Sequence, residues 1–96
     1  MNTNLAAGKA VVIQMTTASA SSKVAPATGK DPEEIWGKHK SVLIKADSAG
    51  ATVYFSDPST GVDGVTLAGN ESLSLDYAGP IWVNSSTGTT TIVALG

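Results

Sequence analysis

From residue 41 onward, short apolar runs alternate with turn-forming residues at a spacing of roughly 8 to 12 positions. Within residues 71–77, Leu73, Leu75 and Tyr77 alternate with polar residues, which is the period of a strand with one buried face. The same reasoning predicts β-strands over residues 41–46, 51–56, 62–67, 71–77, 81–84 and 89–95. The expected fold is therefore all-β, a small antiparallel β-sandwich or jelly-roll-like domain.

The turns between these strands carry specific chemistry. Residues 47–50 (DSAG) are expected to close the first strand pair, and Asp57-Pro58 fits the first two positions of a type I turn. Gly69-Asn70 is a signal for a two-residue hairpin, and residues 86–88 are expected to form a turn before the last strand. These signals favour neighbouring strands that pair in chain order.

The first 40 residues follow a different pattern. Residues 10–16 (AVVIQMT) are β-branched and suit one strand, but residues 17–30 are rich in Thr, Ala and Ser and contain too little apolar surface to fold alone. Extended, that segment spans roughly 46 Å, enough to deliver the strand to another subunit. The sequence thus predicts an extended N-terminal arm over residues 1–40 and a β-sandwich body over residues 41–96.

Two tryptophans are candidates for partner contact. Residues 31–37 (DPEEIWG) have the signature of a short helical turn, which would hold Ile35 and Trp36 against an apolar surface. That surface is either a partner or the chain's own sheet. Both faces of residues 81–83 are apolar, so Trp82 lies either in a doubly covered central strand or at an interface.

Composition and charge narrow the function. The 96 residues include no cysteine, so a disulfide framework and a thiolate metal site are excluded. The hydrophobic share of 42% is ordinary for a folded domain. Six lysines against three acids give residues 1–46 a net charge of +3, whereas residues 47–96 carry five acids and no base. Arginine is absent, and the apolar runs are far shorter than the roughly 20 residues of a spanning helix. We therefore expect no nucleic-acid and no membrane partner.

Little in the chain suggests reaction chemistry. From Ser48 onward there is no His, Lys, Arg or Cys, and the single histidine, His39, stands between two lysines. Asp57 and Asp63 offer oxygens in one loop, but the spacing resembles a calcium site only loosely, and a turn is favoured. We expect no catalytic residue, no metal, no cofactor and no enzymatic activity.

The C-terminal half carries a resemblance. Residues 55–58 (FSDP), 64–76 (GVTLAGNESLSLD), 79–84 (GPIWVN) and 91–95 (TIVAL) resemble small β-sandwich decoration, or cement, proteins of tailed-bacteriophage capsids. The resemblance implies a structural protein on the outer surface of the capsid in the virion. Its partners would be the major capsid protein and copies of itself, as a homo-trimer. The expected partner-binding residues are Leu5, Val11, Val12, Ile13, Ile35, Trp36 and Trp82.

A second hypothesis from another class remains. Trp36, Trp82 and Tyr77 could serve as stacking platforms of a carbohydrate- or receptor-binding module in a tail or head fibre. That function requires exposed, coplanar rings around a groove, whereas a cement protein requires an apolar or strand-pairing contact surface.

Overall fold

The computed structural model describes residues 9–96, without the side chains of residues 17–21 and 86–87. The strands are β1 (Ala10–Lys23), β2 (Ser41–Lys45), β3 (Ala51–Tyr54), β4 (Val65–Leu67), β5 (Ser72–Leu75) and β6 (Trp82–Leu95), with one 3₁₀ turn, η1 (Pro58–Thr60). The all-β, sandwich-like fold expected from the sequence is confirmed. Within the described range there is no helix of the length and hydropathy needed to cross a membrane.

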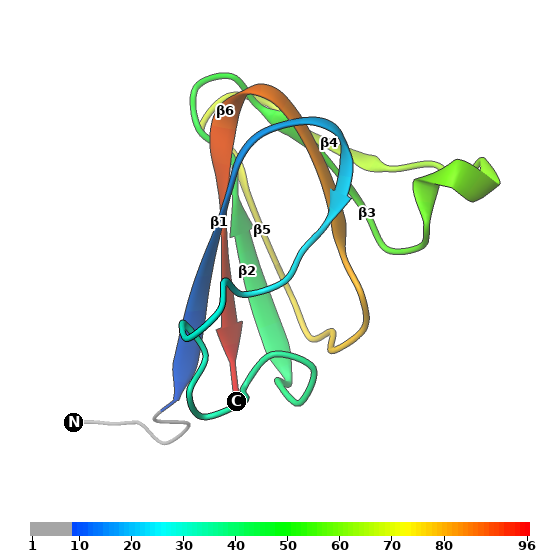
Figure 1. The fold of residues 1–96 in the computed structure, drawn as a ribbon. Helices are drawn as coiled ribbons and strands as arrows, with labels where there is room; N and C mark the ends of the chain where they lie inside the picture. Colours follow the sequence, from blue (N-terminus) through cyan, green and yellow to red (C-terminus); the bar gives the residue numbers. More distant parts are fainter. Residues whose placement is uncertain (1–8) are drawn as a thin grey trace.

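Two antiparallel layers of four strands make up the domain. The first layer has the order β5-β2-β6-β1 and the second the order β4-β3-β6-β1, because β1 and β6 run through both. Residues 10–16 of β1 and 89–95 of β6 lie in the first layer, and the other ends of both strands lie in the second. Figure 1 shows β1 and β6 arching together over one end of the sandwich.

The turn expected at residues 86–88 is absent, because β6 continues through these residues with a bend. The two predicted strands 81–84 and 89–95 form one strand, whose ladder with β1 shifts register between Thr16 and Ser22. At the bend, the Thr89 N–H donates to Asp47 Oδ2 at 2.6 Å. A side chain at Gly88 would collide with the Asp47 carboxylate. Instead of a turn, β6 therefore has a bend that the Asp47 carboxylate stabilises. Bends of this kind let one strand pass from one layer of a sandwich to the other.

The turns at residues 47–50 and 68–71 form, but they do not close hairpins. The Gly50 N–H donates to Asp47 O at 3.0 Å, and the Glu71 N–H donates to Ala68 O at 3.0 Å. However, β2 pairs with β5 and β6, while β3 pairs with β4 and β6. Both turns therefore cross between the layers, and the expectation of hairpins at these positions is wrong. The Asn70 N–H donates to Asp47 O at 2.8 Å and joins the two crossings.

The core lies between the layers and is aliphatic. In β2 the alternation places Val42 and Ile44 inward and Leu43 outward. The buried apolar side chains are Val11, Ile13, Val24, Ile35, Val42, Ile44, Ala46, Ala51, Val53, Leu67, Ile81, Val83, Ile92 and Ala94. Members of this core come from both halves of the chain, so one hydrophobic cluster holds the whole domain together.

The separate N-terminal arm is a prediction that the structure corrects. β1 pairs with β6 of the same chain, from Ala10 opposite Leu95 to Lys23 opposite Trp82. Val11 and Ile13 are core residues, so the boundary after residue 40 does not separate an arm from a body. Composition was misleading here because a Thr/Ala/Ser-rich segment that cannot form a core can still be ordered by backbone hydrogen bonds to a neighbouring strand.

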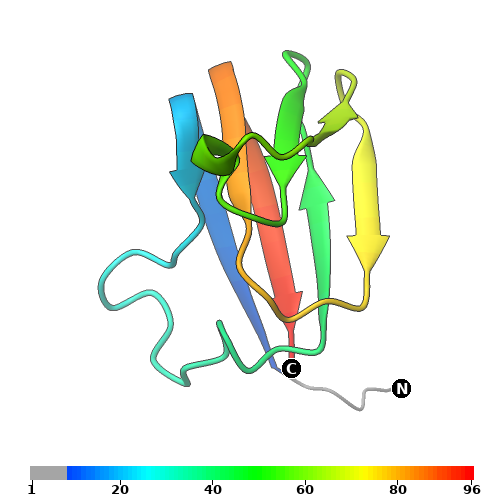
Figure 2. The ribbon, with the colours of Figure 1, turned by 90° about the vertical axis from the view of Figure 1, so that its right-hand side faces the viewer.

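The helical turn expected at residues 31–37 is also absent. Glu34 has a φ of +54° and Gly37 a φ of +94°, which breaks the helical path and leaves two successive turns. Asp31 still provides the capping chemistry, because its carboxylate accepts the N–H groups of Ile35 and Trp36 at 2.9 Å each. Figure 2 shows this connection leaving β1 and passing below the first layer to reach β2.

Candidate partner-binding surface

Exposed and half-buried apolar side chains form a line across the outer face of the first layer. Val12 on β1 and Leu43 on β2 both lie opposite Val93 on β6. Residues opposite one another in an antiparallel pair point to the same face. We call Val12, Val93 and Leu43 the apolar row. Val12 is 55% exposed and Leu43 is 37% exposed, although both are aliphatic.

The surroundings of the apolar row are those of a contact surface. The neighbouring cross-strand set adds Leu95, which is 40% exposed and lies opposite Ala10 on β1. The set on the other side is polar, with Thr91 between Gln14 and Lys45. An apolar centre with a polar rim on a folded domain is typical of a protein–protein interface.

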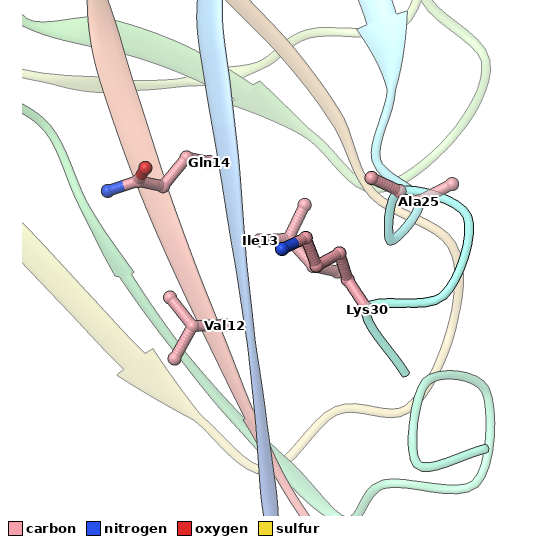
Figure 3. Close-up of a pocket in the computed structure, with 6 residues that line it drawn as sticks. Val12, Ile13, Gln14, Ala25 and Lys30 are labelled. Atoms are coloured by element: carbon pink, nitrogen blue, oxygen red, sulfur yellow. The ribbon is translucent and has the colours of Figure 1, made fainter. Parts of the chain in front are cut away.

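The edge of β1 that faces away from β6 borders this surface, and no other strand of the described residues pairs with its first-layer part. The Gly96 N–H donates to Lys9 O at 3.1 Å, which makes residue 9 a hydrogen-bonded position of the β1–β6 ladder. Because such positions alternate along an antiparallel pair, the backbone groups of Val12 and Gln14 point away from β6. A hollow of about 290 Å³ lies along this edge, lined by Val12, Ile13, Gln14, Ala25, Ala27 and Lys30. Figure 3 shows Val12 and Gln14 on one side of β1 and Ile13, Ala25 and Lys30 on the other.

A second hollow, of about 250 Å³, lies beside the aromatic residues. Trp36 contributes to its wall together with Lys23 and Pro80. The Trp36 ring stacks on His39 with a centroid separation of 4.6 Å, and Lys23 Nζ lies 5.6 Å from the Trp82 ring centroid. Each tryptophan therefore already uses one ring face within the chain.

Tyr77, the third aromatic candidate, is held by internal contacts. Its hydroxyl donates to Pro80 O at 2.8 Å, and its ring meets Phe55 edge to face at 5.0 Å. Each of the three proposed stacking residues therefore already has an aromatic or cationic contact within the chain.

His39 has a structural position. It is 2% exposed, and its Nδ1 accepts the Gly37 N–H at 3.1 Å, which closes the turn that carries Trp36. Burial lowers the pKa of His39 below its ordinary value of 6.5, against the raising effect of the nearby carbonyls of Ile35 and Tyr77. The side chain is therefore neutral near pH 7.

The Asp57 loop behaves as the sequence predicts. The Thr60 N–H donates to Asp57 O at 3.1 Å, which confirms the expected turn, and the Asp57 carboxylate accepts the Ser59 N–H at 2.9 Å. This hydrogen bond lowers the pKa of Asp57. Across the part of the chain that the structure describes, no three His, Asp or Glu side chains gather in a group that could hold a metal ion.

The predicted partner-binding residues differ in how exposed they are in the structure. Val12 is exposed, while Trp36 and Trp82 are half-buried. The prediction of partner contact is wrong for Val11, Ile13 and Ile35. These side chains are buried in the core of their own domain and are not accessible to a partner. Leu5 lies outside the described residues.

Sequence reasoning missed Leu43, Val93 and Leu95. A signal was present, since β6 reads Ile92, Val93, Ala94, Leu95 and β2 has Leu43 between two other aliphatic residues. A strand with apolar residues on both faces is either covered twice or exposes one apolar face. Which of the two applies depends on the layer arrangement, and that is fixed by pairings far apart in the sequence.

Comparison of the chain with protein-family models, with curated protein sequences and with solved structures finds no match.

Proposed function

We propose that this chain is a structural protein of a bacteriophage particle, a decoration protein that binds the outer surface of the capsid and stabilises the shell. The single observation that carries the proposal is the apolar row, Val12, Val93 and Leu43, in which Val12 and Leu43 are exposed on a polar-rimmed sheet face. The resemblance of residues 55–95 to capsid cement proteins supplies the partner, the major capsid protein.

Binding would use the sheet face rather than a detached arm. Leu43 lies on β2, an inner strand of the first layer, so its backbone is fixed on both sides by β5 and β6. A face whose backbone is already fixed by hydrogen bonds can bury apolar side chains against a coat protein with little loss of conformational entropy. Each decorated position then adds buried area to the shell, which stabilises the assembled state over the dissociated one.

The test is cosedimentation of the purified chain with expanded phage heads. Leu43→Glu removes an apolar contact and places a charge in the interface, and full burial of a leucine contributes about 1.5 to 3 kcal/mol. We therefore expect binding to weaken at least tenfold. Thr52→Glu, on the outer face of the second layer, is the matched control and should bind as the unchanged protein does. Retained binding of the Leu43→Glu protein would contradict the proposal.

The carbohydrate- or receptor-binding module is the alternative. The hollow beside Trp36, Lys23 and Pro80 is the place where a sugar ring could stack against an indole. Calorimetry against a glycan panel separates the two functions. Saturable glycan binding that is lost in Trp36→Ala, together with no binding to phage heads, would favour the alternative over the decoration protein.

A further inference from the structure

The first layer has two open edges that match each other in direction. Among the described residues, the first-layer part of β1 pairs only with β6, and β5 pairs only with β2. Each neighbouring pair is antiparallel and the layer has four strands, so its two edge strands run in opposite directions. Two copies placed side by side in the same orientation would therefore bring β1 of one copy antiparallel to β5 of the next.

The backbone groups at the two edges are also available for pairing. On β5, Glu71 O accepts the Ala46 N–H at 2.9 Å, so residue 71 bonds towards β2 and the alternation leaves Ser72 and Ser74 pointing to the open side. On β1, Val12 and Gln14 point to the open side by the same argument. The side chains of all four residues are exposed on the outer face. A ladder between the two edges thus keeps both cores on the same side of the joined sheet.

The charges favour joining unlike edges. Lys9 precedes β1 and Lys30 lines the hollow along its edge. β5 is bounded by Glu71 and Asp76. A symmetric β1–β1 contact would bring the two Lys30 side chains towards each other across one edge, whereas a β1–β5 contact brings lysines towards carboxylates.

The first-layer part of the β1 edge lacks two common protections against pairing, a charged residue and a proline. Residues 10–16 contain no charge and no proline, and natural edge strands that avoid association generally carry one of these. A hollow of about 290 Å³ separates the β1 edge at Val12 and Gln14 from the loop residues Ala25, Ala27 and Lys30. The edge is therefore suited to receive one more strand.

We propose that copies of this chain associate edge to edge, with β1 of one copy pairing antiparallel with β5 of the next, Val12 opposite Ser74. In this register Asp76 of the second copy lies opposite Ala10, beside Lys9. The contact is between unlike surfaces, so it generates a closed ring or an open chain of copies rather than an isolated dimer. It also aligns the apolar rows of successive copies on one face. Val12 belongs both to the apolar row and to this edge. The capsid-binding test, however, changes Leu43 on the inner strand β2, and the partner-edge tests change Ser74 and Asp76, so failure of one proposal is distinguishable from failure of the other.

Sedimentation velocity of the full chain over a range of concentrations tests the backbone pairing. The unchanged protein should form species larger than a dimer, and added salt should weaken them. Val12→Pro and Ser74→Pro each remove one N–H from an open edge without removing a ladder hydrogen bond, and proline is tolerated at such positions. Each variant should stay folded by circular dichroism and lose association. A monomeric unchanged protein at millimolar concentration, or association blocked by Val12→Pro and retained in Ser74→Pro, would overturn the proposal.

A charge exchange tests the partner edge. Lys9→Glu and Asp76→Lys should each weaken association by roughly tenfold, since each turns an attraction into a repulsion. An equal mixture of the two variants should associate again, because the altered edges are complementary. Lys40→Glu and Asp63→Lys make the same charge changes at exposed positions elsewhere and should associate as the unchanged protein does. Lys9 also pairs with Glu33 at 2.9 Å, but both side chains are more than half exposed, so stability should hardly change. A mixture that fails to associate would refute the β1–β5 contact.

Discussion

Replacing Thr90 with valine should stabilise the domain. Thr90 is fully buried on the inner face of β6, and its hydroxyl has no hydrogen-bond partner among the described residues. A buried polar group left unpaired costs about 1 to 3 kcal/mol, and valine keeps the β-branched shape while removing the hydroxyl. We therefore expect a gain of about 1 to 2 kcal/mol in the free energy of unfolding, because repacking of the new methyl group offsets part of the benefit.

The assay is urea unfolding followed by tryptophan fluorescence, supported by calorimetry. For a domain of this size, 1 kcal/mol corresponds to about 4 to 8 °C in Tm. Thr91→Val makes the same chemical change one residue along, on the outer face, and should alter stability by less than about 0.5 kcal/mol. A Thr90→Val protein that is less stable than the unchanged chain would show that the hydroxyl has a partner, and the reasoning would fail.

Three further predictions concern a buried base, a carboxylate and a turn glycine. His39 has a lowered pKa when folded, so stability should be highest above about pH 6.5 and fall as the pH decreases below it, and His39→Gln should flatten this dependence in urea unfolding. The hydrogen bonds to Asp47 lower its pKa below 3.8, so its contribution is present above that pH and lost as the pH falls through the folded-state pKa; Asp47→Asn should lower the urea midpoint at pH 7. Gly50→Ala meets both a φ of +77° and a contact of 2.7 Å to the carbonyl oxygen of Leu67, and should cost about 2 to 4 kcal/mol in thermal unfolding. Gly29→Ala, with a φ of +80° and open space around it, should cost only about 1 kcal/mol, and equal losses would contradict the steric part of the argument.

The strand positions could be predicted from local alternation, but the strand partners could not. Residues 71–77 were expected as a strand because Leu73 and Leu75 alternate with serines, and β5 lies within that range. The Gly69-Asn70 signal predicted only the turn, since nothing local shows that the chain crosses to another layer there. The single long β6 depends on Asp47, a residue more than forty positions away that accepts the Thr89 N–H.

The candidate surface shows the same limit. Val12 was expected at an interface and is exposed, but its neighbours Val11 and Ile13 were expected there too and are core residues. From the sequence, all three residues belong to one apolar segment, and the sequence does not show which of them face the second layer. Leu43 could not be predicted as part of a contact surface, because a single outward leucine forms an apolar surface only when β6 places Val93 beside it.

The pairing of β1 with β6 has a consequence for biosynthesis. Val11 lies opposite Ala94, so the strand that the ribosome makes early finds its partner only after nearly all of the domain has been translated. Until then, Val11, Val12 and Ile13 form an apolar, uncharged stretch on a nascent chain with no strand to cover them. Long-range pairing of this kind delays folding, and the waiting segment is a natural target for chaperones or for premature association between chains.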